Sequence, residues 1–116
     1  MTHDEINHFC AGLPGVTRDI KWGCDRVYSV GAKMFLCMLE DPSPEDGLSF
    51  KVEPERFLEL TDRPGIAPAP YLAKHHWIKL ANPKVLPAAE LQYLILRSYE
   101  LVFSRLPKRL QASLRP

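Results

Sequence analysis

Residues 26–39, RVYSVGAKMFLCML, decide the fold of this chain. Two runs rich in aliphatic and aromatic residues flank Gly31, and the whole stretch from residue 17 to 52 follows a period of two. That period is typical of β-strands, and a glycine between two such runs suits a tight turn. We therefore predict a β-hairpin with strands at 26–30 and 33–39.

Helices are predicted before and after the hairpin along the sequence. Thr2 and Glu5 have the spacing of a helical capping box. Pro54 and Pro87 stand at the first helical position, where proline is favoured. Apolar residues recur every three to four positions over about 20 residues after Pro87, which predicts the longest helix there. The predicted helices start at residues 2, 54, 87 and 108, and the long one reaches about residue 106.

The remaining elements complete one sheet. Further strands are predicted around residues 20–22, 48–52 and 77–80, and the loop at 41–47 consists of turn-forming residues. Because hairpins rather than βαβ crossovers join the early strands, the sheet should be mainly antiparallel. The predicted fold class is α+β: a two-layer sandwich with helices packed on one face, forming a single domain over residues 1–116.

Composition indicates an ordinary soluble domain. The chain has 116 residues, of which 46% are hydrophobic and 25% charged. It shows no secretory leader and no uncharged run of the ~20 residues that a membrane span needs, so we expect a cytoplasmic protein without a membrane partner. Its three cysteines form no CxxC pair, which argues against a disulfide framework. A monomer is favoured.

Net charge changes sign along the chain. Residues 1–60 contain six Lys and Arg against eleven Asp and Glu, whereas residues 61–116 contain nine against three. This asymmetry suits a protein with one side facing a polyanion, although solvated charges on a loop and a helix end would give the same count. The basic excess is greatest near the C-terminus, at Arg105, Lys108, Arg109 and Arg115.

A proline-rich segment leads into the main candidate surface. Residues 68–79 read PAPYLAKHHWIK, a rigid extended approach followed by a strand. Alternation puts Trp77 and Lys79 on one side of the sheet, and it puts Lys33, with Phe35 and Cys37, on that same side. Cations on phosphates beside rings that stack on bases suit single-stranded nucleic acid. The candidate nucleic-acid-binding residues are Lys33, Lys51, Lys74, Trp77 and Lys79, supported by Arg105, Lys108 and Arg109.

This face of the sheet is expected to be only partly covered, because the long helix must bury its stripe against the other face. We expect Lys51 and Lys79 to be solvated and Trp77 to be at least partly accessible. DNA binding there would be weak, sequence-tolerant and sensitive to salt. In the alternative interpretation Trp77 packs under the C-terminal segment, and the lysines only protect a sheet surface.

Two other functions remain open. A proline-fixed backbone beside aromatic and cationic groups suits a small-molecule or anion-binding pocket around Tyr71, His76, Trp77 and Arg97. An adaptor that binds another protein through a sheet edge or the C-terminal helix is the third possibility.

Catalytic and metal sites are not expected. Cys24 or Cys37 could be paired with His75 or His76 as nucleophile and base, but no local signature supports either pair, and buried cysteine is the commoner role. Adjacent histidines on a strand face opposite ways, and no cysteine pair has zinc spacing. The chain is therefore predicted to be no enzyme and to need no metal or cofactor.

Several short motifs resemble the MmcQ/YjbR family, small bacterial proteins often labelled DNA-binding. The motifs occur in family order across nearly the whole chain: LPG at 13–15, WG at 22–23, VGAKMF at 30–35, LSFKVEP at 48–54, PGIAPAPYL at 64–72, HW at 76–77 and RSYELV at 97–102. The resemblance implies a frataxin-like (CyaY-like) two-layer fold and a double-wing mode of DNA binding.

The resemblance also implies particular site residues. It carries over to Lys33, Lys51, Tyr71, His76, Trp77, Arg97 and Tyr99, which adds Tyr99 to the candidate ligand pocket. Iron binding of the frataxin type would need a densely acidic first helix, and here that helix has only Asp4 and Glu5.

Overall fold

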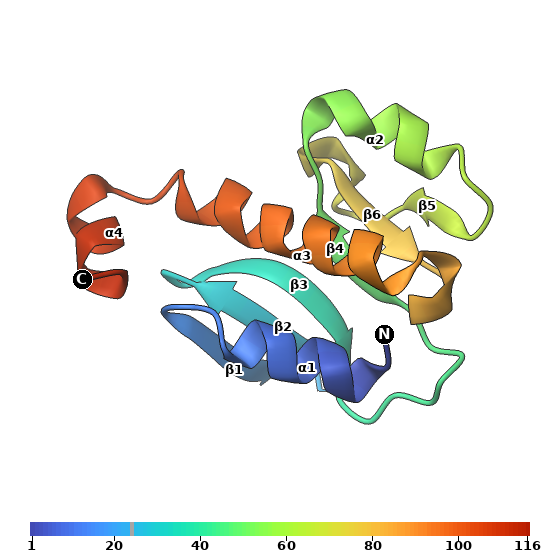
Figure 1. Cartoon of the computed structure of the whole chain (residues 1–116), viewed down its shortest axis with the longest axis horizontal. Coiled ribbons are helices and arrows are strands. Elements are labelled where there is room, and N and C mark those ends of the chain that lie inside the picture. Colours follow the sequence, from blue (N-terminus) through green and yellow to red (C-terminus); the bar gives the residue numbers. More distant parts are fainter. Residues whose placement is uncertain (24) are drawn as a thin grey trace.

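The computed structural model describes residues 1–23 and 25–116, and its centre is one twisted antiparallel sheet (Figure 1). The strand order is β1-β2-β3-β4-β6-β5, and every pair of neighbours is antiparallel. The strands are β1 (Val16–Lys21), β2 (Asp25–Val30), β3 (Lys33–Leu39), β4 (Leu48–Lys51), β5 (Ile66–Pro68) and β6 (Trp77–Leu80). The helices are α1 (His3–Ala11), α2 (Pro54–Thr61), α3 (Ala88–Phe103) and α4 (Lys108–Leu114), with 3-10 turns η1 (Ala73–His75) and η2 (Pro83–Val85).

The predicted α+β class and antiparallel sheet are confirmed. The hairpin of β2 and β3 and all four helices lie where the sequence predicts them. Two details differ. The extended lead-in at 66–68 is itself the edge strand β5, and β1 ends at Lys21, so Trp22 lies in the following turn with φ 55° rather than in the strand. Cys24 falls outside the described residues.

The turn between β2 and β3 favours glycine at position 31. Gly31 and Ala32 both have positive φ, 57° and 64°, as in the two-residue turns whose twist matches that of the flanking strands. A Cβ on Gly31 would also lie 2.6 Å from Cδ1 of Leu106. The turn therefore packs closely against the segment that follows α3, and its positive φ favours glycine at position 31.

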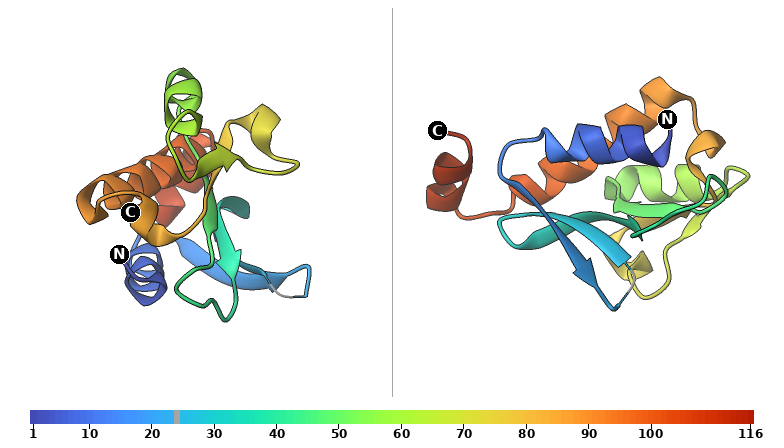
Figure 2. Two further views of the ribbon diagram at one scale, coloured as in Figure 1. Left: turned by 90° about the vertical axis from the view of Figure 1, so that its right-hand side faces the viewer. Right: turned by 90° about the horizontal axis from the view of Figure 1, so that it is seen from below.

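Helices α1 and α3 lie on one side of the sheet, while η1 and the tip of the β1–β2 hairpin project on the other (Figure 2). The apolar stripe of α3 packs mainly on β3 and β4. Leu36, Phe50 and Ile78 are fully buried in the resulting core, together with Leu91 and Ile95 of α3. The predicted pairing of the long helix with this sheet face is confirmed.

A bulge in β3 overturns one face assignment. Tyr28 pairs with Leu36 but Ser29 pairs with Met34, so Phe35 is an extra residue in the ladder. Its side chain is fully buried, and its ring meets that of Tyr99 edge-on at 5.5 Å between centroids. Phe35 was predicted to share the outer face with Lys33 and Cys37. The bulge turns it into the core instead.

Ser98 of α3 links the two strands beyond the bulge. Its hydroxyl donates to the backbone oxygen of Phe35 at 2.6 Å and accepts from the backbone N–H of Lys51 at 3.0 Å. The described β3–β4 pairing ends at Leu36 and Phe50. A side chain therefore replaces the next hydrogen bond between the strands, and the sheet opens at this end.

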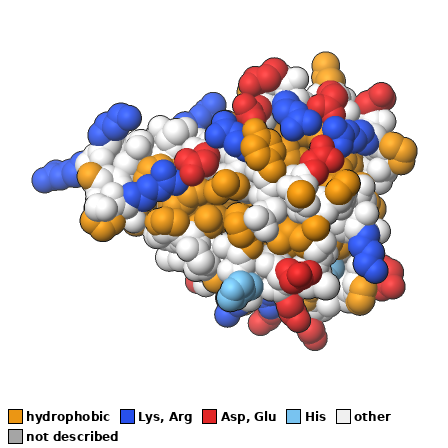
Figure 3. All heavy atoms as spheres, in the orientation of Figure 1, with side chains coloured by type: hydrophobic (Ala, Val, Ile, Leu, Met, Phe, Trp, Pro, Cys, Tyr) orange, Lys and Arg blue, Asp and Glu red, His pale blue; other side chains and the backbone are white. Residues whose placement is uncertain are grey.

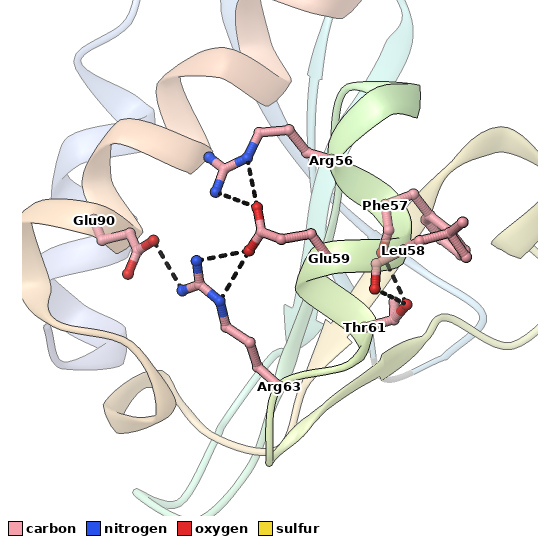
Figure 4. A network of polar contacts seen from close by, with 7 residues as sticks. All are labelled: Arg56, Phe57, Leu58, Glu59, Thr61, Arg63 and Glu90. Carbon is pink, nitrogen blue, oxygen red and sulfur yellow. Dashed lines mark hydrogen bonds and ion pairs between the residues drawn. The ribbon is translucent and has the colours of Figure 1, made fainter.

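Ion pairs join α2 to α3 on the surface (Figure 4). Glu59 binds Arg56 at 2.9 Å and Arg63 at 2.7 Å, and Arg63 reaches Glu90 of α3 at 2.9 Å. The hydrogen bond from Arg56 is the largest influence on Glu59, and the pKa of that carboxyl is lowered. Such exposed pairs contribute little stability singly, but they fix the position of α2 beside α3.

Within the described residues, none of the helices has both the length and the apolar character needed to cross a bilayer.

Candidate functional site

A cavity of about 360 Å³ lies where β3 and β4 separate. The opened end of the sheet, the turn η1 and the C-terminal end of α3 form its walls. Its lining residues are Lys33, Met34, Lys51, Leu72, His75, Trp77, Val102, Arg105, Leu106 and Pro107. The cavity thus joins three of the predicted surface residues with one of the supporting cations.

Sheet register places two of these residues together. Lys51 and Trp77 pair directly across β4 and β6, so both side chains leave the sheet on the same side. The ammonium of Lys51 donates to the backbone oxygen of His75 at 2.6 Å. This bond holds the lysine against η1 at the edge of the cavity.

Trp77 is buried, with 4% of its surface exposed, which contradicts the prediction of an accessible ring. The segment before β6 is hydrogen-bonded to its backbone: the N–H of Ala69 donates to the oxygen of Trp77 at 3.0 Å, and the N–H of Trp77 donates to the oxygen of Leu72 at 3.3 Å. The lead-in and the C-terminal segment both border the cavity that Trp77 lines, through Leu72 on one side and Leu106 and Pro107 on the other. Trp77 forms a wall of the cavity instead of an open stacking platform.

The cavity is lined by cations without a carboxylate among its described lining residues. Lys33, Lys51 and Arg105 come from three different elements, and the walls between them are largely apolar. Burial lowers the pKa of Lys51, and the charge of Arg105 lowers it further. An anion placed here would therefore gain attraction from three groups that repel one another when the cavity is empty.

Lys79 belongs to a different environment. It pairs with Ser49, on the same face as Lys51, and it is exposed as predicted. However, it lines two other cavities in which Asp46 is also present, one of them with Asp25. Lys79 therefore shares the predicted face with Lys51 and Trp77, but it lies among acidic side chains and does not line the cavity. The shared face is wrong for Lys33, which lies beyond the bulge and pairs with the core residue Val30, although it lines the cavity at the start of β3. Lys74 is exposed on η1, next to His75 of the cavity.

The second candidate pocket is not assembled as predicted. Of its five residues only Trp77 lines the cavity. Tyr71 is 97% exposed, whereas Tyr99 is fully buried and donates its hydroxyl to the backbone oxygen of Pro14 at 2.6 Å.

The other two members of that pocket have separate structural contacts. The ring of His76 meets that of Phe57 edge-on at 5.6 Å between centroids. Arg97 forms an ion pair with Glu53, the residue that precedes α2, at 3.4 Å. Both contacts attach α2 to its neighbours.

The apolar walls were missed by the sequence analysis. Leu72 belongs to the predicted proline-rich lead-in, and Val102 and Leu106 belong to the predicted apolar stripe of the long helix, so none of them was expected to line a cavity. The basic excess near the C-terminus, which includes Arg105, did indicate this end of the molecule.

Cysteine and metal chemistry gain no support. Burial raises the pKa of Cys10 to about 12 and that of Cys37 to about 11, so both thiols stay protonated and weakly nucleophilic at neutral pH. Across residues 1–23 and 25–116, no group of three or more His, Cys, Asp and Glu side chains could hold a metal ion.

Basic side chains also gather around this end of the molecule. In the space-filling view Lys and Arg lie over α4 at the left, while Asp and Glu lie mostly toward the other end (Figure 3). In this view the basic side chains of the C-terminal helix α4 therefore lie at the end of the molecule away from most of the acidic ones.

Comparison with known proteins establishes the family. The sequence model of the YjbR family matches residues 11–101. This chain belongs to the YjbR family. Its structure is similar to the crystal structure of the Deinococcus radiodurans protein DR2400, a DUF419 domain, with 30% sequence identity and a TM-score of 0.87 over 98% of this chain and 88% of that one.

A second similar fold is that of a crystallised protein from Pseudomonas syringae. It has 24% identity and a TM-score of 0.70, over 88% of this chain and 99% of that one. No curated protein matches the chain. Membership in the YjbR family thus confirms the resemblance and the fold.

Proposed function

We propose that this YjbR-family chain is a non-enzymatic module that binds a small organic anion in the cavity beside Trp77. The observation that supports the proposal most strongly is the meeting of Lys33, Lys51 and Arg105 around one concave, largely apolar space. Ligand pockets are usually of this kind: apolar walls, a few convergent polar groups and a volume of about 300–1,000 Å³.

The lining defines the ligand class. Three cations without a lining carboxylate favour an anion, and the side chains of Leu72, Trp77 and Val102 favour an apolar body attached to it. A bare inorganic ion would leave the apolar walls uncovered, and an uncharged hydrocarbon would leave the cations unpaired. A carboxylate or phosphate with an aliphatic or aromatic substituent fits both.

Isothermal titration calorimetry with a panel of aliphatic and aromatic carboxylates and phosphate esters tests the proposal. Removing a cation that contacts the ligand should weaken binding about tenfold, the effect of losing a charged hydrogen bond of roughly 1.5 kcal/mol. Lys33→Ala and Arg105→Ala should each show this loss. Lys84→Ala, on the exposed turn η2, is the matched control and should bind like the wild type. Equal affinity of the wild type and the three variants for the anions would refute the site.

Weak, sequence-tolerant DNA binding is the second candidate function. It is favoured by the exposed cations around the cavity, because Lys74, Lys108 and Arg109 extend the basic surface outward from Arg105. Burial of Trp77 removes the stacking contribution, so phosphate contacts alone would supply the affinity.

Fluorescence anisotropy with labelled single- and double-stranded DNA separates the two functions. If DNA binds, the affinity should fall steeply with added salt, and the double variant Lys108→Ala/Arg109→Ala should weaken it. The same variant should leave the binding of a small anion unchanged, since neither residue lines the cavity. DNA binding that ignores salt, or none at low salt, excludes this candidate.

A further inference from the structure

The amine of Lys51 is placed for more than charge attraction. It lies at the end of β4 against the wall formed by Trp77, and its Nζ is held by the backbone oxygen of His75 at 2.6 Å. Lys33 and Arg105 line the same cavity. An anionic ligand can therefore be neutralised by those two groups, and the amine can exchange its bond to His75 for a reaction with another part of the ligand.

The surroundings of Lys51 make its ammonium less stable than that of an isolated lysine. Partial burial penalises the ammonium, and the positive charge of Arg105 adds to that penalty, so the pKa of Lys51 lies below its ordinary value. No carboxylate among the described lining residues opposes this effect. Desolvation and a neighbouring cation are the two influences that activate lysines as nucleophiles toward carbonyl compounds.

We propose that Lys51 holds a 2-oxo acid as an imine, an inference that rests on the anion-binding function proposed above. The nitrogen of the neutral amine bonds to the ketone carbon of the ligand. The ketone oxygen then leaves as water with the two hydrogens of the amine, and a carbon–nitrogen double bond remains. The step consumes no oxidant or reductant. The carboxylate pairs with Arg105 and Lys33, and an apolar substituent lies against Leu72, Trp77 and Val102.

Reductive trapping tests the imine. The protein is incubated with 2-oxo-4-methylpentanoate and sodium cyanoborohydride, and the adduct is located by intact mass and peptide mapping. We expect one major adduct, on Lys51. Lys51→Arg keeps the charge and length but has no primary amine, so it should lose the adduct while retaining its circular dichroism spectrum. Arg105→Gln should reduce trapping about tenfold, and Lys84→Ala should match the wild type.

Two outcomes overturn the proposal: no adduct, or an adduct spread evenly over the seven lysines. Calorimetry with 2-hydroxy-4-methylpentanoate, which has the carboxylate and side chain but no ketone, separates this failure from that of the anion site. Binding of the hydroxy acid without trapping of the oxo acid refutes only the imine. Failure of both acids to bind refutes the anion site for this ligand class as well.

Discussion

Ser98 lies on the apolar stripe of α3, where its hydroxyl is fully buried yet makes two hydrogen bonds. A buried polar group is costly unless it is paired, and both of its partners are backbone groups that the opened sheet would otherwise leave unpaired. One hydroxyl therefore satisfies the strand ends that border the cavity. The position of Lys51 depends on it, because the second bond is to the backbone of that residue.

Replacing Ser98 with Ala should destabilise the fold by about 2–3 kcal/mol, because it leaves a buried N–H and a buried carbonyl without their partner. Urea denaturation followed by circular dichroism measures the change. Ser104→Ala is the control: the hydroxyl of this exposed serine bonds only to Leu101 in its own turn, so its loss should change stability by less than about 0.5 kcal/mol. A loss for Ser98→Ala as small as that of the control would show that water or a strand shift satisfies these groups.

The buried thiols make stability depend on alkaline pH. In the fold the pKa of Cys10 is raised to about 12 and that of Cys37 to about 11, from an ordinary value of 9.0. Because the unfolded chain loses these protons first, their contribution is complete below about pH 9 and is lost as pH rises through the folded values. Between pH 9.0 and its pKa in the fold, each thiol should lower the free energy of unfolding by about 1.4 kcal/mol for each unit that the pH rises.

Comparing the wild type with Cys10→Ala by urea denaturation at several pH values above 8 measures this effect. The variant loses some packing at every pH, so the informative quantity is the slope of stability against pH rather than its level. That slope should be shallower in Cys10→Ala. Identical slopes would assign the alkaline loss to other groups.

At the scale of elements, periodicity predicts most of the fold because each signal is local. The capping box at Thr2 forms as expected, with Thr2 and Glu5 bonded reciprocally, and alternation correctly places Lys51 beside Trp77. Two features could not be read in this way. The bulge at Phe35 goes with packing against Tyr99, and the burial of Trp77 goes with the meeting of the lead-in and the C-terminal segment at the cavity. Both arise from contacts between distant segments.

Gly47 shows how closely the elements approach one another. It precedes β4, and a Cβ at this position would overlap the backbone oxygen of Leu80 in the partner strand β6. Because backbone cannot move aside without breaking the strand pair, Gly47→Ala should cost several kcal/mol or prevent folding. Gly12→Ala is the control, since its Cβ would have ordinary contacts at 3.6 Å.

Thermal unfolding measured by circular dichroism compares the two glycine variants. The control should melt near the wild-type temperature, whereas Gly47→Ala should melt at least about 10 °C lower or be recovered unfolded. If Gly47→Ala melts with the wild type, β4 and β6 can separate locally at lower cost than their pairing indicates.

In the whole molecule, the cavity is lined by residues from position 33 to position 107. The sequence therefore predicts several of the lining residues but not the cavity that they form together. Lys51 and Trp77 share a face by alternation, which is a local property, whereas Lys33 lies beyond the bulge and reaches the cavity from the start of β3. Arg105 joins them only because α3 continues past the open end of the sheet, and Lys79 is separated from them by its acidic neighbours. Charge asymmetry indicated the correct end of the molecule without defining the cavity.

The two tryptophans lie in different environments and can report on this arrangement. Trp77 is 4% exposed in the cavity wall, whereas Trp22 is 66% exposed at the end of the β1–β2 hairpin. In Trp22→Phe, which retains only Trp77, the emission should be blue-shifted and acrylamide should quench it weakly. In Trp77→Phe the remaining emission should be red-shifted and strongly quenched. Acrylamide is preferred to iodide because an anionic quencher would compete for the cavity.

The same two variants can test the binding of an organic anion. The ligand should change the emission of Trp22→Phe, because Trp77 lines the site, and should leave that of Trp77→Phe unchanged. The matched aliphatic alcohol, which lacks the charge, should change neither spectrum. A response confined to Trp77→Phe would place the ligand near the hairpin tip, and equal acrylamide quenching of both variants would show that Trp77 is not buried in solution.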